Sequence, residues 1–522
     1  MPEQKSLPSP LKNQKVTLSP NPSPDRGGPA LFVSTGRARG WLMVTLCLVL
    51  AVASLAACTG SPTPDPTLAP TLTATPLPSP TPPPSITPDQ DLAEVVAAAD
   101  EGDTIYLAAG EFTLAQGIEI SKTLTLVGAG SDQTMIKFSA PGEGFSAAIM
   151  YSGSGSLSIQ GVKLSYGGAD PATVVYVKSG SLSLQDCYIH GATLSDSGSQ
   201  LGALHLANDV VASVVDSQIA GSVERANAEA PEKIPGGIIM YGNSQLVIED
   251  SEVFDSYLGI YAYGASQVTA RRVTFRNTYA GVDLMENATA SLEGNTFTNN
   301  VGFHLMLFGD TKAIATGNTF AGASTSTGVQ VHENANVHLE GNTISDMLSG
   351  IIFTDNATGE VVSNTLASFT DIGIFVNGYA APQLDSNTIS GSAYPGAIGI
   401  TYQENASGGA AHNQISNLVM GISLSELAAP SLESNEILYC EQGIFYQNEA
   451  SGLATLNIIQ FGDYGILIGS PAHPVITGNT IQAYSKALAS SPEDWINQLS
   501  VSDNFVQAGE PEIIRVTVTP KP

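Results

Sequence analysis

The sequence has few cations. It contains 19 Lys and Arg against 48 Asp and Glu, which gives a formal net charge of −29 at pH 7. No Lys or Arg occurs between Lys312 and Lys486. Nucleic acids bind to concentrated positive charge, so this excess of carboxylates argues against a nucleic-acid partner. It also argues against polyanion binding by the second half of the chain, and it suits neutral glycans, cations or simple solubility.

Cysteine is equally scarce, with four residues in 522. Cys47 lies in an apolar segment near the start, and Cys58 follows that segment directly. Cys187 and Cys440 are separated by about ten repeats of the pattern described below, so we expect them to be too far apart for a disulfide. No spacing of Cys and His indicates a metal site. We therefore predict that Cys187 and Cys440 are buried core residues.

Helical periodicity is also absent from most of the chain, and a repeat of about 22 residues takes its place. Asparagine returns every 22 to 26 residues, at Asn295, Asn318, Asn342, Asn364, Asn387, Asn413, Asn435, Asn457 and Asn479. A fixed period of this size indicates one structural unit stacked on copies of itself. Stacked amides about 4.8 Å apart can donate to and accept from one another, and Asn tolerates the left-handed backbone of a sharp turn. We therefore interpret this ladder as structural.

A second ladder reads Gly-apolar-x-apolar, at Gly281, Gly302, Gly328, Gly350, Gly373, Gly399, Gly421, Gly443 and Gly465. A period of two with one apolar face predicts a short strand in each repeat. Short strands joined by tight Gly and Asn turns predict an all-β, single-stranded parallel β-helix of about 14 coils. The register continues backwards through Val273, Ser251, Ser217, Cys187 and Val162, with loop insertions near 193–200 and 223–235.

The ends of such a solenoid need covers, because an open coil exposes apolar side chains and unpaired backbone. Residues 91–100 form an apolar stripe of good helix formers, so we predict an N-terminal helical cap there. Residues 491–499 begin like a helix, with Ser followed by Pro. A last strand pair is expected at 499–501 and 505–507, and the tail from 510 is expected to add an edge strand or to stay loose.

The opening Gly102-Asp103-Thr104-Ile105-Tyr106-Leu107 and the segment Leu124-Thr125-Leu126-Val127-Gly128-Ala129-Gly130 resemble the pectin-lyase-like superfamily. The Gly-Ile and Gly-Asn-Thr-Ile ladders resemble right-handed parallel β-helix repeat proteins. The resemblance implies a right-handed solenoid over roughly 91–507, with 508–522 as a C-terminal tail. These motifs are turn and core residues, so they specify the fold far more strongly than the function.

The first 90 residues differ in composition from the rest. Trp41–Ala57 is mostly apolar, follows Arg37 and Arg39, and ends in Leu55-Ala56-Ala57-Cys58, which resembles a bacterial lipoprotein signal. The resemblance implies that 1–57 is removed, that Cys58 is lipidated, and that the protein is anchored outside the cytoplasm. An uncleaved transmembrane anchor is the alternative. Residues 1–36 are long for a leader, which suggests a start codon assigned too far upstream. Residues 58–90 are rich in Pro and Thr, which predicts an extended stalk.

Chemistry on a β-helix is expected on an exposed strand face. The positions two and four after each ladder Gly are predicted to point outward, and they include aromatics, amides, imidazoles and a carboxylate. Aromatic faces beside hydrogen-bonding groups suit sugar rings, whereas a plain solvated sheet face is the alternative. The candidate glycan-binding residues are Tyr261, Tyr263, Asp283, His304, Gln330, His332 and Phe375.

A third ladder of carboxylates lies five residues after the Gly. Glu333 with Asp355, and Glu404 with Glu426, belong to adjacent coils and are the candidates for a calcium site. Calcium takes six to eight oxygen ligands, and two carboxylates with nearby carbonyls could begin such a site. Solvated turn residues and acid–base catalysis are the alternatives.

Enzymatic function is the harder question. Lyases of this fold need an acidic metal cluster beside an Arg or Lys base, and the only basic cluster is Arg271, Arg272 and Arg276. The Asn-Thr-Asp, Asp-Asp and Gly-His-Gly motifs shared by the polysaccharide hydrolases do not occur. Asp283, His304 and His332 are the catalytic candidates. We therefore predict a lipid-anchored protein that binds or scaffolds glycan, with a polysaccharide lyase or glycoside hydrolase, and a structural spacer or adhesin, as alternatives.

Overall fold

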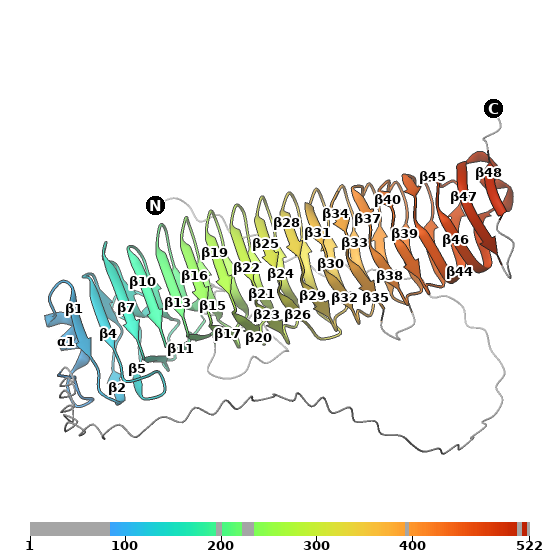
Figure 1. Cartoon of the computed structure of the whole chain (residues 1–522). Helices are drawn as coiled ribbons and strands as arrows, with labels where there is room; N and C mark the ends of the chain where they lie inside the picture. The colour runs from blue at the N-terminus through green and yellow to red at the C-terminus, as the bar shows by residue number, and fades with distance from the viewer. Residues whose placement is uncertain (1–83, 195–200, 222–233, 392–395, 509–513, 519–522) are drawn as a thin grey trace, which may run out of the picture. The chain divides into compact units, whose positions relative to one another are not determined.

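The computed structural model describes residues 84–194, 201–221, 234–391, 396–508 and 514–518. These residues wind into an all-β parallel solenoid of about 17 turns (Figure 1). The predicted leader, Cys58, most of the predicted stalk and most of the two predicted insertions lie outside the described residues. Within the described part of the chain, no helix has the length and apolar character needed to cross a bilayer.

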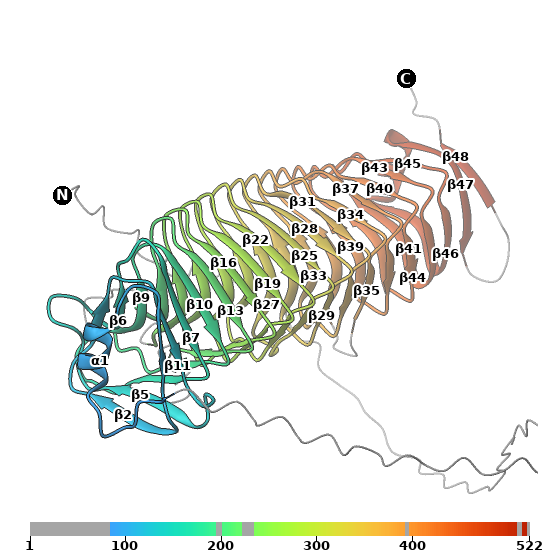
Figure 2. The same cartoon turned by 60° about the vertical axis from the view of Figure 1, so that its left-hand side comes forward.

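Each turn contributes one strand to each of three parallel stacks, because each strand pairs with the strand three further along the chain (Figure 2). Stack A contains β1 (Asp103–Tyr106), β4 (Leu124–Val127), β7 (Ser156–Gln160), β10 (Ser181–Gln185), β13 (Val211–Val215), β16 (Gln245–Glu249), β19 (Gln267–Arg271), β22 (Thr289–Glu293), β25 (Lys312–Thr316), β28 (Asn336–Glu340), β31 (Thr358–Val362), β34 (Gln383–Asp385), β37 (Gly409–Ala411), β40 (Ser431–Glu433), β43 (Leu453–Thr455), β45 (Val475–Thr477) and the first part of β47 (Ser500–Ala508).

Stack B contains β2 (Gly110–Leu114), β5 (Thr134–Phe138), β8 (Lys163–Tyr166), β11 (Tyr188–His190), β14 (Gln218–Ala220), β17 (Glu252–Phe254), β20 (Thr274–Arg276), β23 (Thr296–Thr298), β26 (Thr319–Ala321), β29 (Thr343–Ser345), β32 (Thr365–Ala367), β35 (Thr388–Ser390), β38 (Gln414–Ser416), β41 (Glu436–Leu438) and the first parts of β44 (Ile458–Gly469) and β46 (Thr480–Ser491). The last part of β47 closes this stack.

Stack C contains β3 (Ile118–Ile120), β6 (Ala147–Tyr151), β9 (Thr173–Val177), β12 (Gly202–Leu206), β15 (Gly236–Met240), β18 (Leu258–Ala262), β21 (Ala280–Leu284), β24 (Phe303–Leu307), β27 (Thr327–Val331), β30 (Ser349–Phe353), β33 (Ile372–Val376), β36 (Ile398–Tyr402), β39 (Met420–Leu424), β42 (Gln442–Tyr446) and the last parts of β44 and β46. The predicted total of about 14 coils was too low. The count fails in the first turns, where the Gly and Asn signals that mark each repeat are missing.

The core forms because apolar side chains alternate along each short strand. In β21, Val282 and Leu284 point inward and have no exposed surface, and the same two positions are buried in the stack C strands that follow. Cys187 and Cys440 are buried and unpaired, as predicted, and burial raises the pKa of each thiol to about 12. Burial at about 25 cal/mol per Å² of apolar surface makes this continuous core the main stabilising term.

The predicted amide ladder is present and has a tenth rung, Asn504. In each step one Asn donates both its backbone N–H and its side-chain amide to the Oδ1 of the next, as from Asn342 to Asn364 at 2.9 Å each. Ser251 and Ser217 hold the same position further back, since their hydroxyls accept from the backbone N–H of Ser217 and Cys187. The ladder Asn residues do not use their tolerance of the left-handed backbone. The residue before each Asn has positive φ instead, for example Gly341 at 61°.

Both ends of the solenoid carry the elements that the sequence predicts. Helix α1 (Leu92–Ala98) begins at Asp91, whose side chain accepts from the backbone N–H of Ala93 and Glu94, and it buries Leu92 and Val96 against the first turns (Figure 1). At the other end, the 3₁₀ helix η2 (Glu493–Gln498) packs Trp495 on the core. Strand β48 (Ile514–Val518) then adds an antiparallel edge to β47.

Candidate functional site

The outer face of stack C holds most of the predicted glycan-binding residues in two columns. Tyr261 pairs in register with Asp283, and the same column continues through Met306, Gln330, Ile352 and Phe375. The second column consists of the residues that lie two positions after members of the first column, namely Tyr263, Met285, Phe308 and His332. The structure therefore brings Tyr261, Tyr263 and Asp283 together on the adjacent turns that contain β18 and β21, with Gln330, His332 and Phe375 further along the face.

His304 does not face outward, so its predicted position was wrong. Val282 pairs with Leu305 and Asp283 with Met306, so His304, and not Gly302, holds the position of the ladder Gly. Its ring has no exposed surface and lies edge-on to Phe297 and Phe320. Burial lowers the pKa of His304 to about 4. A signal for this shift exists in the sequence, because the ladder Gly precedes the next Asn by 14 residues in eight of nine repeats but Gly302 precedes Asn318 by 16.

An aromatic strip lies on the outer face of stack C between β15 and β24. We define it as Tyr241, Tyr257, Tyr261, Tyr263, Tyr279 and Phe303, which pack on Ile239, Leu258, Ala280 and Met285. Ring centroids lie 5.8 Å apart for Tyr241 and Tyr263, 5.2 Å for Tyr257 and Tyr279, and 5.6 Å for Tyr279 and Phe303. Tyr261 is 5% exposed and the other five rings are half-buried. The strip is a separate apolar cluster outside the main core.

Sequence reasoning missed four residues of this strip, namely Tyr241, Tyr257, Tyr279 and Phe303. Tyr279 stands two residues before Gly281, and Tyr257 stands two residues before Gly259, which holds the equivalent position one turn earlier. Their 22-residue spacing was therefore a usable signal. The rule that only positions two and four after the Gly point outward excluded them. They reach the same face because the chain bends at the ladder Gly, which leaves Gly259 and Gly281 outside the register of paired residues.

Asp283 is the one predicted ligand-binding carboxylate that the structure buries beside this strip. It is 5% exposed, and its Oδ1 has no hydrogen-bond partner. It lies between Tyr261 and Met306 in its column, so larger side chains of the two neighbouring turns cover it. Burial raises the pKa of Asp283 to about 7, because an ionised carboxylate without water or a partner is costly. The nearby Glu286 differs, since it is exposed and accepts a hydrogen bond from the Tyr263 hydroxyl.

His332 makes its own contacts two turns away from Asp283. Its ring stacks on Phe308 with centroids 4.3 Å apart, and its nitrogens lie 2.9 Å from Gln330 Oε1 and 2.8 Å from Thr354 Oγ1. Burial lowers the pKa of His332, while Asp355 opposes this. Two turns correspond to about 10 Å along the stack. The three catalytic candidates, Asp283, His304 and His332, therefore do not converge on one point.

The predicted calcium residues occupy equivalent positions in the turn between stacks C and A. Glu333, Asp355, Glu404 and Glu426 all have φ between 55° and 60°, so they are left-handed turn residues on the surface. In the first pair, Asp355 Oδ2 accepts from the backbone N–H of Glu333 at 3.1 Å. Among the described residues, no three His, Cys, Asp or Glu side chains gather in a way that could hold a metal ion. The two residues of each pair lie in adjacent turns, and other oxygens would have to complete any cation shell.

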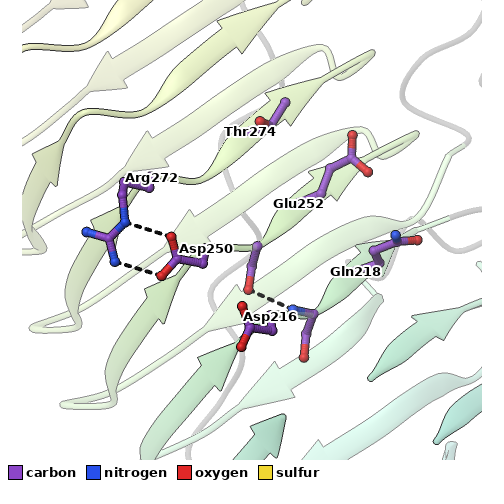
Figure 3. Close-up of a pocket in the computed structure, with 8 residues that line it drawn as sticks. Asp216, Gln218, Asp250, Glu252, Arg272 and Thr274 are labelled. Atoms are coloured by element: carbon purple, nitrogen blue, oxygen red, sulfur yellow. Dashed lines mark hydrogen bonds and ion pairs between the residues drawn. The ribbon is translucent and has the colours of Figure 1, made fainter. Parts of the chain in front are cut away.

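A polar hollow of about 430 Å³ lies apart from the strip, where stack A turns into stack B (Figure 3). Its lining is Asp216, Ser217, Gln218, Asp250, Ser251, Glu252, Arg272 and Thr274. Arg272 donates to both oxygens of Asp250 at 2.6 and 2.7 Å, and this hydrogen bonding holds the pKa of Asp250 below its usual value.

The rest of the predicted basic cluster is paired as well. Arg271 lies 2.7 Å from Glu249, and Arg276 pairs with Glu252 while stacking on Phe254. Each guanidinium therefore bonds a carboxylate of the preceding turn. The cluster ties neighbouring turns together, because each of its three guanidinium groups is engaged by a carboxylate of the turn before it.

Comparison with known proteins agrees with this architecture. The family model described as "Right handed beta helix region" matches residues 147–320 and 327–481, more than half of the chain. No curated protein matches the sequence.

Several solved structures are similar in fold. They include the catalytic unit of a thermostable GH87 alpha-1,3-glucanase from Streptomyces thermodiastaticus strain HF3-3, at 12% identity, coverage of 62% of this chain and 69% of that chain, and a TM-score of 0.43. The mannuronan C-5 epimerase AlgE6 A-module of Azotobacter vinelandii is 14% identical, with 76% and 93% coverage and a TM-score of 0.38. The alginate lyase AlyF-OU02 is 10% identical, with 68% and 85% coverage and a TM-score of 0.42. Likeness at this level concerns the fold alone.

Proposed function

The chain belongs to the right-handed β-helix family, and from that premise we propose that it binds glycan through the aromatic strip on the outer face of stack C. The observation that carries the proposal is the gathering of six aromatic rings outside the main core, five of them half-buried. Half-buried tyrosines present a flat apolar face together with a polar hydroxyl. Sugar rings need both, because their C–H faces stack on aromatics while their hydroxyls form hydrogen bonds.

We further propose that the protein is displayed outside the cytoplasm of a bacterial cell on a lipid anchor at Cys58. The support is the apolar run Trp41–Ala57, which ends in Leu55-Ala56-Ala57 directly before Cys58, and the Pro- and Thr-rich segment that separates Cys58 from the solenoid. Incorporation of a labelled fatty acid tests the anchor. The label should enter the native chain and not Cys58→Ser, and equal labelling of both would refute the proposal.

A glycan array probed with the full-length protein tests the binding function. Tyr241→Ala should weaken binding about tenfold, because it removes a half-buried aromatic contact worth about 1 kcal/mol or more. Tyr261→Ala should have a similar effect, because it removes the buried ring against which Tyr241 packs edge to face. Tyr379→Ala is the matched control, since Tyr379 is 66% exposed and lies in a turn away from the strip. Glycan binding that survives both strip substitutions would place the binding site elsewhere. If the native protein binds no glycan on the array, the proposed function is refuted.

A glycan-cleaving enzyme is the second candidate, and one observation favours it. A carboxyl whose pKa is about 7 suits a general acid at neutral pH, and Asp283 has this property. A reducing-end assay on the glycans that bind, together with ultraviolet detection of unsaturated products, separates the candidates. Binding without turnover supports a binding protein. Turnover that Asp283→Ala abolishes supports a hydrolase or lyase, and neither binding nor turnover supports a spacer or adhesin.

A further inference from the structure

Among the described residues, the charged groups in stack C from β15 to β24 and in the turns that directly follow these strands are acidic. Asp283 lies next to two tyrosines, Tyr261 in β18 and Tyr279 in the turn before β21. Burial raises the pKa of both phenols, and the negative charge of an ionised Asp283 raises it further. On the other side, β24 contributes Phe303 and Met306, which do not titrate. Glu286 adds a second carboxylate at the hydroxyl of Tyr263. Among the described Lys and Arg residues, none lies in stack C between β15 and β24.

This arrangement leaves one polar atom unsatisfied directly beside the strip. Asp283 is more than nine-tenths buried, and its Oδ1 has no hydrogen-bond partner among the side chains that surround it. Unsatisfied buried acceptors are uncommon and each requires an explanation. A sugar hydroxyl can both donate to and accept from a protonated carboxyl, so one hydroxyl would satisfy the group. A sugar carboxylate would instead face two protein carboxyl groups with no described cation beside it.

We propose that the strip takes an uncharged glycan, and that Asp283 is the polar anchor that hydrogen-bonds a sugar hydroxyl as a neutral carboxylic acid. This inference rests on the proposed function, which it narrows to a substrate class and a named residue. A ligand over the strip removes the remaining water from Asp283 and so favours its protonated form. Binding should therefore weaken as pH rises through 7, the value to which burial raises the pKa of this carboxyl.

Isothermal titration calorimetry on the full-length protein tests both parts. The probes are xylohexaose, cellohexaose and mannohexaose as neutral glycans, and hexagalacturonate as the charged one, at pH 5.5 and pH 8.5. At least one neutral hexasaccharide should bind, at least tenfold tighter than hexagalacturonate. Its affinity should fall roughly tenfold or more at pH 8.5, where most Asp283 is ionised.

Two substitutions make the assignment specific. Asp283→Asn keeps the shape but cannot ionise, so it should lose the pH dependence and bind roughly tenfold tighter than the native chain at pH 8.5. Asp283→Leu removes the hydrogen bond and should weaken binding about tenfold at pH 5.5. Asp371→Asn is the control, because Asp371 precedes β33 outside the strip and burial also raises its pKa. It should keep both the affinity and the pH dependence of the native protein.

The outcomes separate this inference from the function on which it rests. Neutral-glycan binding that Tyr261→Ala weakens but that is independent of pH, or that Asp283→Asn does not alter at pH 8.5, would overturn the role of Asp283 and leave the proposed function standing. Equal or tighter binding of hexagalacturonate would overturn the substrate class alone. Binding to none of these probes nor to any array glycan would overturn the proposed function and this inference with it. Thermal unfolding of each variant shows whether it is folded.

Discussion

Removing one rung of the amide ladder tests the physical basis of the whole solenoid. Asn364 is buried, and its Oδ1 accepts from the backbone N–H and the side-chain amide of Asn342, both at 2.9 Å. Its own amide donates to the carbonyl of Leu339 at 2.9 Å and to Asn387 Oδ1 at 3.1 Å. Asn364→Ala therefore leaves a buried N–H of Asn342 without its acceptor and removes a donor from Leu339.

Each buried polar group that loses its partner costs about 1–3 kcal/mol, so Asn364→Ala should destabilise this part of the solenoid by about 3 kcal/mol or more. The effect should be local, because stacked repeats contact only their neighbours and open in segments. Hydrogen exchange measured by mass spectrometry is the suitable assay. Peptides spanning 336–367 should exchange faster by about two orders of magnitude, while peptides near α1 should not change.

The matched control is Asn356→Ala. Asn356 is also an asparagine stacked on its neighbour, since its amide donates to Asn334 at 3.3 Å, but it lies exposed on the surface. Its removal should change stability by no more than about 0.5 kcal/mol, because water replaces the lost bond. Equal effects of the two substitutions would refute the argument that buried amide bonding stabilises the turns. Asn364→Asp offers a further check, since its carboxylate would face the carbonyl oxygens of Leu339 and Val362 and should destabilise at least as much at pH 7.

Three further predictions concern titration and cations. The pKa of Asp283 is about 7 in the folded chain and about 3.9 in an unfolded one, so stability should fall by up to about 4 kcal/mol as pH rises from 4 to 7, and Asp283→Asn should remove that loss in urea titrations. The pKa of His304 is about 4 in the folded chain and about 6.5 in an unfolded one, so the stability that the neutral imidazole contributes is lost as pH falls from 6.5 to 4. His304→Leu should therefore reduce the acid sensitivity of the melting temperature without altering glycan affinity. Millimolar calcium should leave the melting temperature unchanged, because Glu333 and Asp355 have no third acidic partner among the described residues, and a clear rise would identify a cation site at this turn.

The sequence alone determined the repeat and therefore the fold. Asn295 through Asn479 recur at the spacing of one turn, and the residues one and three after the ladder Gly are apolar wherever the register is regular. These signals are local: a strand, a turn and an amide need only their own residues to be recognised. The same reasoning correctly predicted α1 and the ladder positions of Ser217 and Ser251.

Only the tertiary structure decided what the outer face presents. His304 lies inside because an irregular turn moves the register by two residues. The period of two cannot reveal such a shift, and the longer spacing from Gly302 to Asn318 marks the irregular turn without showing which side chain it buries. Asp283 occupies an outward position and is nevertheless buried, because Tyr261 and Met306 from the turns on either side are larger than the carboxyl between them. Whether a side chain on a solenoid reaches water depends on its own volume and on the volumes of the side chains at the equivalent position in the turns before and after it. Those residues lie about 22 positions apart in the chain and become neighbours only when the turns stack.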